Sequence, residues 1–127
     1  MARILIADDD RQVLCLVQRL LNDAGYETRE ASNGLSALEF FHTFFFDLII
    51  TDLRMPGMDG MGFINEVRQL EPAVPIIVLT AYAVPEVTEC DNNKGKFIYM
   101  AKPFEIDALL GCITEVLSCA SRSYACS

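Results

Sequence analysis

The sequence has no run of apolar residues that approaches the ~20 needed to span a membrane, although 52% of its 127 residues are hydrophobic. At its N-terminus it has no basic segment leading into the apolar core of a signal peptide. Basic residues are scarce too, because 10 Lys and Arg stand against 18 Asp and Glu, for a formal charge of -8. We therefore expect a cytoplasmic protein of one domain that binds neither membranes nor, by itself, nucleic acid.

The chain also lacks the residue patterns of a zinc site and of a cysteine–histidine catalytic pair. His42 is its only histidine, and its five cysteines form no CxxC pair. We interpret His42 as a helix-surface residue and most of the cysteines as free thiols. Cys112, Cys119 and Cys126 recur every seven residues, so they would share one flank of a continuous helix. That flank is either a pairing face or a row of small residues beside a core stripe.

Short apolar runs alternate with segments of helical periodicity along the chain. The strand-like runs are residues 4–7, 27–31, 48–50, 75–79 and 97–100, and the helix-like segments are residues 13–24, 34–41, 61–70, 84–95 and 105–118. Asp10 and Asn33 can cap the first two helices, and Gly25 can close the first. The pattern predicts an α/β fold, a doubly wound five-stranded parallel sheet with helices on both faces. A flavodoxin-like strand order of 2-1-3-4-5 would leave the polar second strand at an edge.

Helical spacing predicts which apolar side chains face the core. The inward faces include Leu35 in the second helix, Leu70 in the third and Ile106 in the last. Residues 84–95 offer few apolar side chains and contain several poor helix formers, so we expect a weakly held helix there that changes on switching. Phe44, Phe45 and Phe46 are consecutive, and three consecutive aromatic side chains cannot all point inward.

Polar residues follow several of the predicted strands. Asp8 and Asp9 follow the first strand, Asp52 the third, Thr80 the fourth and Lys102 the fifth. The carboxyl ends of parallel strands meet at one rim, where open α/β sheets bind their ligands. Carboxylates gathered there repel one another unless a cation lies between them, and few carboxylate ligands with room for water favour Mg²⁺. Asp52 could then be a nucleophile toward a phosphoryl group, with Lys102 and a Thr80 hydroxyl beside it.

In their order along the chain these residues form a specific combination. It comprises Asp8-Asp9, Asp52 with Met55-Pro56-Gly57-Met58-Asp59-Gly60 after it, Thr80-Ala81, and Tyr99 with Lys102-Pro103-Phe104. In this combination the chain resembles the receiver domain of bacterial two-component response regulators. The resemblance implies a receiver domain over residues 1–120. Residues 121–127 would then be a short tail, either frayed or the start of a linker to an output domain.

The resemblance also implies a role for each matching residue. Asp52 would be the phosphoacceptor. The metal ligands would be Asp8, Asp9, Asp52 and the backbone carbonyl of Arg54, binding Mg²⁺ with Mn²⁺ as a substitute. Lys102 would pair with the phosphoryl group, and a cis peptide would precede Pro103.

Signal output and partners follow from the same resemblance. Thr80 and Tyr99 would relay phosphorylation to the face formed by residues 84–95, 97–100 and 105–118. The phosphoryl donor would be a sensor histidine kinase or a histidine phosphotransfer protein, and the same face could form a homodimer. The domain would not be an enzyme beyond its own phosphoryl transfer and slow autodephosphorylation.

Two other classes fit the sequence less well. A Mg²⁺-dependent phosphatase with an aspartyl nucleophile would want a second carboxylate two residues after Asp52, where this chain has Arg54. A flavodoxin-like cofactor binder would want a hydroxyl-rich or glycine-rich loop after the first strand, where this chain has Asp8-Asp9-Asp10. The phosphoacceptor switch is therefore the favoured interpretation.

Overall fold

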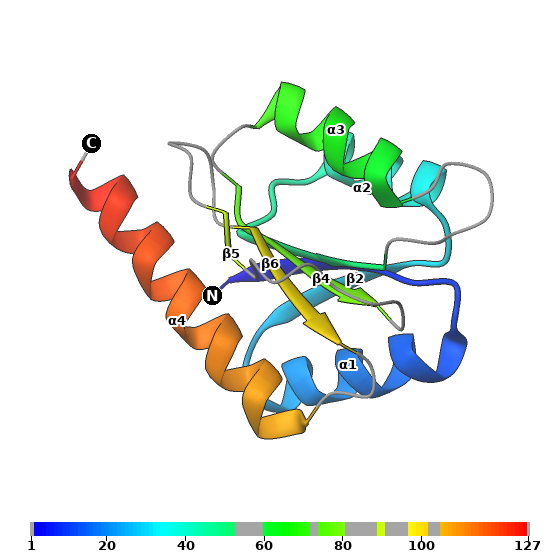
Figure 1. Cartoon of the computed structure of the whole chain (residues 1–127), viewed down its shortest axis with the longest axis horizontal. Coiled ribbons are helices and arrows are strands. Elements are labelled where there is room, and N and C mark those ends of the chain that lie inside the picture. Colours follow the sequence, from blue (N-terminus) through cyan, green and yellow to red (C-terminus); the bar gives the residue numbers. More distant parts are fainter. Residues whose placement is uncertain are drawn as a thin grey trace.

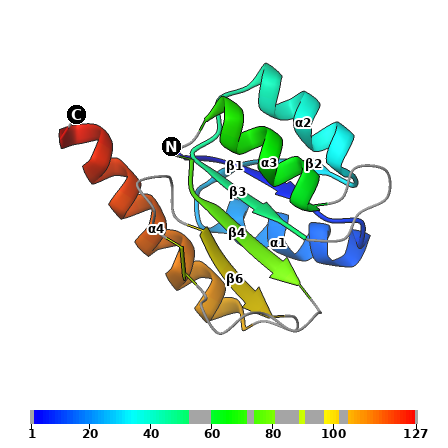
Figure 2. The same ribbon diagram turned by 45° about the horizontal axis from the view of Figure 1, so that its top comes forward.

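A computed structural model describes residues 2–52, 60–71, 74–80, 89–90, 97–101 and 105–126 of the chain. Its core is a sheet covered by helices on both faces (Figures 1 and 2). Among the described residues, no helix is both long and apolar enough to cross a membrane. The α/β layers predicted from the sequence are confirmed.

The described residues form a six-stranded sheet in the order β2-β1-β3-β4-β6-β5. The strands are β1 (Arg3–Ala7), β2 (Glu27–Ala31), β3 (Leu48–Thr51), β4 (Ile76–Thr80), β5 (Glu89–Cys90) and β6 (Phe97–Ala101). The five strands predicted from the sequence are β1, β2, β3, β4 and β6, and all of them pair in parallel. The predicted order is therefore confirmed, with polar β2 at one edge.

The helices are α1 (Arg11–Asp23), α2 (Gly34–Thr43), α3 (Gly60–Leu70) and α4 (Ile106–Cys126). The Asp10 side chain caps α1 by accepting the N–H of Gln12, and Asn33 caps α2 by accepting the N–H of Ser36. Gly25 follows α1 with φ of 96°, a left-handed conformation that glycine adopts without strain. Both predicted caps and the predicted glycine stop are confirmed.

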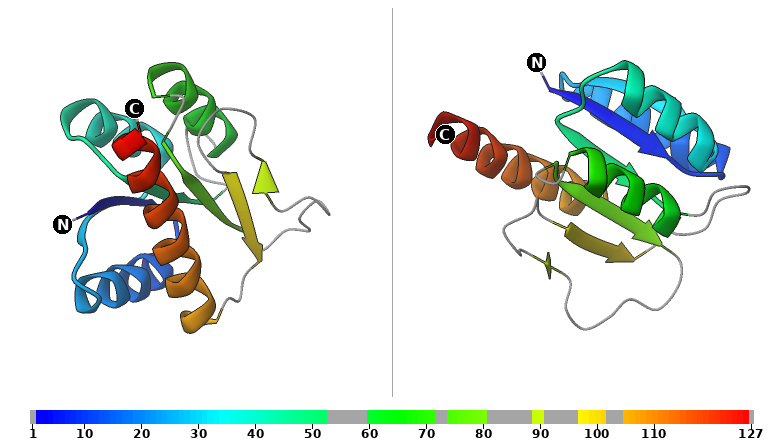
Figure 3. Two further views of the ribbon diagram at one scale, coloured as in Figure 1. Left: turned by 90° about the vertical axis from the view of Figure 1, so that its left-hand side faces the viewer. Right: turned by 90° about the horizontal axis from the view of Figure 1, so that it is seen from above.

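Helices lie on both faces of the sheet in Figure 3. Two hydrophobic clusters, one on each face, hold these layers together. One cluster packs α2 and α3 against the sheet through Ala37, Phe63 and Val67, and the other packs α1 and α4 through Leu14, Val17, Leu21, Leu109, Ile113 and Val116. Successive residues of β3 alternate between the clusters, so Ile49 faces α2 and α3 while Ile50 faces α1 and α4. The sheet is thus buried on both sides, as a parallel sheet requires.

The helix predicted for residues 84–95 is wrong at its centre. Glu89–Cys90 forms β5, which pairs antiparallel with β6 through Glu89↔Ile98 and Cys90↔Phe97. The poor helix formers of this segment stabilise a helix only weakly. Pairing with β6 instead satisfies backbone N–H and C=O groups that the edge of β6 would otherwise expose. The rest of the predicted helix, residues 84–88 and 91–95, lies outside the described residues.

Three side chains predicted to face inward are instead exposed: Leu35 by 55%, Leu70 by 47% and Ile106 by 42%. In α2 the buried side is set by Gly34 and Ala37, so Leu35 lies outside that stripe. Leu70 is the last residue of α3 and Ile106 the first of α4, so each lies at the end of its helix. Helical spacing alone shows neither which side of α2 is buried nor where α3 and α4 leave the sheet.

The sequence pattern predicts that the last helix ends at about residue 118, but the backbone of α4 continues to Cys126. In Figure 1 the C-terminal end of α4 projects beyond the sheet. The division into residues 1–120 and a tail of 121–127 stays a prediction. Neither Cys15 nor Cys112 is in a disulfide bond, as predicted for these two cysteines, and His42 is exposed on α2, also as predicted. Of the three consecutive aromatics, Phe46 is buried and Phe45 is 58% exposed, which confirms that they do not all face inward.

Candidate metal centre

The ends of β1 and β3 bring two aspartates to the same level of the sheet. These strands are parallel neighbours in which Ala7 lies opposite Thr51, so the next residues are Asp8 and Asp52. The backbone N–H of Asp8 donates to Ala31 O at 3.1 Å, and that of Asp52 donates to Ala7 O at 3.0 Å. Each aspartate is therefore anchored to a neighbouring strand just before the chain leaves the sheet.

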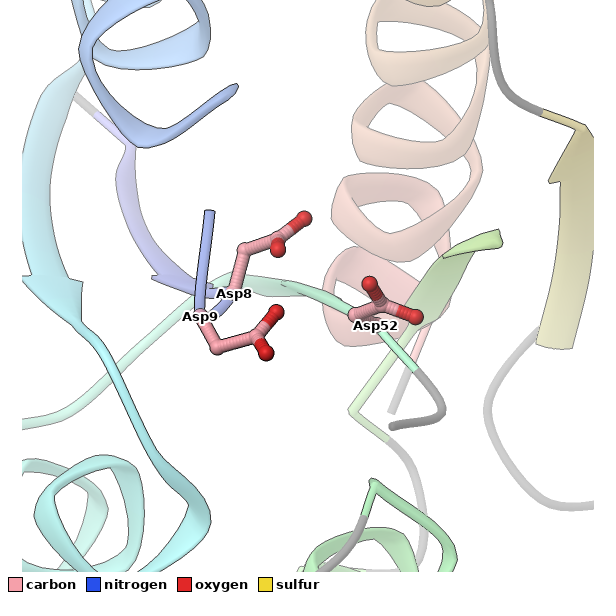
Figure 4. A group of neighbouring side chains, drawn as sticks. All are labelled: Asp8, Asp9 and Asp52. Atoms are coloured by element: carbon pink, nitrogen blue, oxygen red, sulfur yellow. The ribbon is translucent and has the colours of Figure 1, made fainter. Parts of the chain in front are cut away.

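Asp9 completes a cluster of three carboxylates. Asp8, Asp9 and Asp52 each offer an oxygen, and these three oxygens all lie within 4.8 Å of one another. Figure 4 shows the three side chains beyond the ends of β1 and β3. Asp8 and Asp52 are buried, with 2% and 8% of their surface exposed, whereas Asp9 is exposed. The cluster thus has a buried floor and an open side.

This donor set suits a hard divalent cation. Carboxylate oxygens are the ligands that Mg²⁺ prefers, and Mg²⁺ usually keeps several waters beside one or two protein carboxylates. The open side at Asp9 leaves room for such waters or for oxygens of another ligand. Asp8 is also oriented from within the loop, since its Oδ1 accepts the backbone N–H of Asp10 at 3.0 Å. The residues present therefore fit Mg²⁺.

The other predicted site residues are only partly described. Thr80 ends β4 at the same edge of the sheet, and its backbone lies opposite Ala101 of β6. Tyr99 lies within β6, opposite Val78. Arg54, Lys102 and Pro103 lie outside the described residues, so their predicted roles stay predictions.

Thr51 is a neighbour of the site that no sequence motif singles out. It is 1% exposed, and its Oγ1 donates to the backbone carbonyl of Asp52 at 3.0 Å. The available signal was a lone polar residue that ends the apolar run of β3 directly before the carboxylate.

A separate pocket of about 260 Å³ lies beside α1 and the end of β2, lined by Arg11, Leu14, Cys15, Glu30 and Ser32. None of the three carboxylates lines it.

Comparison with known proteins gives consistent matches. A sequence model of the response regulator receiver domain matches residues 4–114. Sporulation initiation phosphotransferase F of Bacillus subtilis (strain 168) is 31% identical over 120 residues, which are 94% of this chain and 97% of that protein. Transcriptional regulatory protein ZraR of Klebsiella oxytoca is 35% identical over 115 residues, 91% of this chain but only 26% of that protein.

Solved structures agree with the sequence matches. A response regulator receiver domain protein (CheY-like) from Methanospirillum hungatei JF-1 superposes with a TM-score of 0.85 at 29% identity, covering 97% of this chain and 98% of that one. Chemotaxis protein CheY4 of Vibrio cholerae gives a TM-score of 0.79 at 32% identity, covering 91% and 98%. The chain spans about a quarter of some curated relatives and nearly all of others. It belongs to the response regulator receiver domain family.

Proposed function

We propose that the chain is a phosphorylation-dependent signalling switch in which Asp52 accepts the phosphoryl group. The observation that carries this proposal is the cluster of Asp8, Asp9 and Asp52, whose oxygens lie within 4.8 Å of one another at the carboxyl ends of β1 and β3. Asp8 and Asp9 hold Mg²⁺ or Mn²⁺ together with Asp52, and the backbone carbonyl of Arg54 is a further ligand. When bound, the cation supplies positive charge against the oxygens of the transferring phosphoryl group.

In the transfer step, one carboxylate oxygen of Asp52 forms a bond to the phosphorus of the donor. The bond between that phosphorus and the donor's imidazole nitrogen or acyl oxygen breaks, and the leaving group keeps the electron pair. The product is an acyl phosphate on Asp52. Buried Asp52 is held in place for this attack, whereas the exposed side of the cluster at Asp9 admits the donor.

The remaining parts of the proposal rest on residues that match the family pattern. Lys102 pairs with the phosphoryl group. Thr80 and Tyr99 relay the presence of the phosphoryl group to the face that includes β6 and α4. A cis peptide precedes Pro103. A sensor histidine kinase or a histidine phosphotransfer protein supplies the phosphoryl group, and a homodimer through the same face is one form of output. The chain acts on no external substrate, and its own acyl phosphate hydrolyses slowly.

The test is labelling with acetyl phosphate, read by intact mass spectrometry. Wild type should gain one phosphoryl group when Mg²⁺ or Mn²⁺ is present and none when EDTA has removed the metal. Asp52→Asn should gain none, because its amide is not a nucleophile. Asp23→Asn is the matched control, since Asp23 is an exposed carboxylate at the end of α1, and it should label like wild type. Equal labelling of Asp52→Asn would refute the assignment.

A further inference from the structure

Thr51 is the only polar residue of β3, and its hydroxyl is buried beside the proposed phosphoacceptor. Its side chain is 1% exposed, and a buried hydroxyl is stable only with a hydrogen-bond partner. Its Oγ1 donates to the backbone carbonyl of Asp52 at 3.0 Å. The hydroxyl is therefore satisfied by the residue that follows it in the chain.

This bond matters because β3 ends at Thr51, so the sheet no longer fixes both peptide groups of Asp52. The N–H of Asp52 still donates to Ala7 O at 3.0 Å, which holds the preceding peptide against β1. The Thr51 hydroxyl holds the following peptide through its carbonyl. Together the two bonds fix φ and ψ of Asp52, and the backbone angles decide which side-chain rotamers are allowed.

Thr51 itself does not belong to the carboxylate cluster. Side chains alternate along a strand, so Thr51 lies on the face of Ile49, toward α2 and α3, and Asp52 lies on the opposite face. Thr51 can therefore influence the cluster only through the backbone of Asp52.

We propose that Thr51 is a positioning residue whose hydroxyl holds the Asp52 backbone so that its carboxylate meets those of Asp8 and Asp9. The proposal rests on the function proposed above and adds a residue to it. Without the hydroxyl, the Asp52 peptide samples other orientations and the cation must select the correct one. Since a hydrogen bond contributes a modest net free energy, the dissociation constant for the metal should rise about three- to tenfold.

The experiment measures metal affinity directly. Mn²⁺ is titrated into each protein and the free ion is followed by electron paramagnetic resonance, with Mg²⁺ added as a competitor. Thr51→Val keeps the side-chain shape and removes the hydroxyl, and it should weaken Mn²⁺ binding about three- to tenfold. Thr51→Ser keeps a hydroxyl and should bind within about twofold of wild type. Thr51→Ala should bind more weakly than Thr51→Ser, so this second pair gives the answer if Thr51→Val does not fold.

Thr28 provides a matched control. It is also a buried threonine, 8% exposed, whose Oγ1 donates to Asn22 Oδ1 at 3.2 Å, but it lies in the edge strand β2, opposite Ile4. Thr28→Val should lower the melting temperature and leave Mn²⁺ affinity unchanged. If wild type binds Mn²⁺ but Thr51→Val and Thr51→Ala bind it equally well, the positioning role is refuted and the proposed function stands. If wild type itself binds no Mn²⁺, the proposed function fails.

Discussion

Among single residues, Asp10 makes two hydrogen bonds that join the carboxylate cluster to the start of α1. Its backbone N–H donates to Asp8 Oδ1 at 3.0 Å, and its own Oδ1 accepts the N–H of Gln12 at 2.9 Å. The first bond orients Asp8, and the second begins α1 directly after the loop. The loop that carries Asp8 and Asp9 is therefore short, because α1 starts at Arg11, directly after these residues and the cap.

Replacing Asp10 separates the capping role of its side chain from its charge. Asp10→Ala removes the N-cap and should lower the free energy of unfolding by about 1 kcal/mol, whereas Asp10→Asn keeps a capping oxygen and should cost much less. Urea unfolding followed by circular dichroism at 222 nm gives both values. An equal loss in the two variants would show that the charge of Asp10, and not its cap, stabilises the protein.

Among the elements, the connection from α2 to β3 is held against the sheet by an aromatic ring that contacts two cations. The Arg3 guanidinium lies 5.2 Å from the centre of the Phe44 ring, and that of Arg29 lies 4.9 Å from it. Arg3 is in β1 and Arg29 in β2, so one ring links both strands to the connection. Arg3 Nε also forms an ion pair with Glu27 Oε2 at 2.5 Å. Both side chains are partly exposed, and such pairs contribute little to the free energy of unfolding.

Phe44→Leu should therefore cost more than an ordinary surface substitution. It keeps an apolar side chain but removes the ring that both guanidinium groups cover and that meets Phe46 edge to face. We expect a loss of about 1–2 kcal/mol in the free energy of unfolding. Phe45→Leu is the matched control, because Phe45 is 58% exposed, and it should change stability by less than about 0.5 kcal/mol. Equal losses in both variants, measured by urea unfolding, would rule out a special role for Phe44.

For the molecule as a whole, the negative net charge and the carboxylate cluster both favour the binding of a cation. The chain has a formal charge of -8, and three of its carboxylates gather at one rim of the sheet. A cation that binds only where the folded sheet assembles these groups stabilises the native state by mass action. Stability should therefore depend on divalent metal.

At a hundredfold excess of Mg²⁺ over its dissociation constant, the folded state should gain about 2.7 kcal/mol. For a domain of this size that gain raises the melting temperature by on the order of 10 °C. Thermal melts with MgCl₂, and with NaCl at the same ionic strength, separate binding from charge screening. Asp9→Asn should be more stable than wild type without metal and gain less from Mg²⁺. Coinciding wild-type melts in the two salts would mean that the cluster does not bind the cation.

Several features of this protein follow from short-range sequence patterns. Asp10 and Asn33 could be identified as caps, and Gly25 as a helix stop, because each acts within a few residues of its own position. The convergence of Asp8, Asp9 and Asp52 could be predicted because each follows a buried strand and parallel strands share a rim. Leu35 and Ile106 could not be placed correctly, since spacing alone shows neither which side of α2 packs against the sheet nor where α4 first meets it.

By itself the sequence determined the alternation of strands and helices, the strand order and the three carboxylates at the rim, because local periodicity and chain connectivity allow few other arrangements. Only the tertiary structure decided that Glu89–Cys90 pairs with β6, that the Phe44 ring contacts both Arg3 and Arg29, and that the Thr51 hydroxyl holds the Asp52 carbonyl. The ring contact joins segments distant in the chain, the pairing depends on the free edge that β6 offers to Glu89–Cys90, and the hydroxyl bond depends on the backbone geometry where β3 ends. No local pattern specifies such contacts, because they exist only once the sheet and its helices have packed.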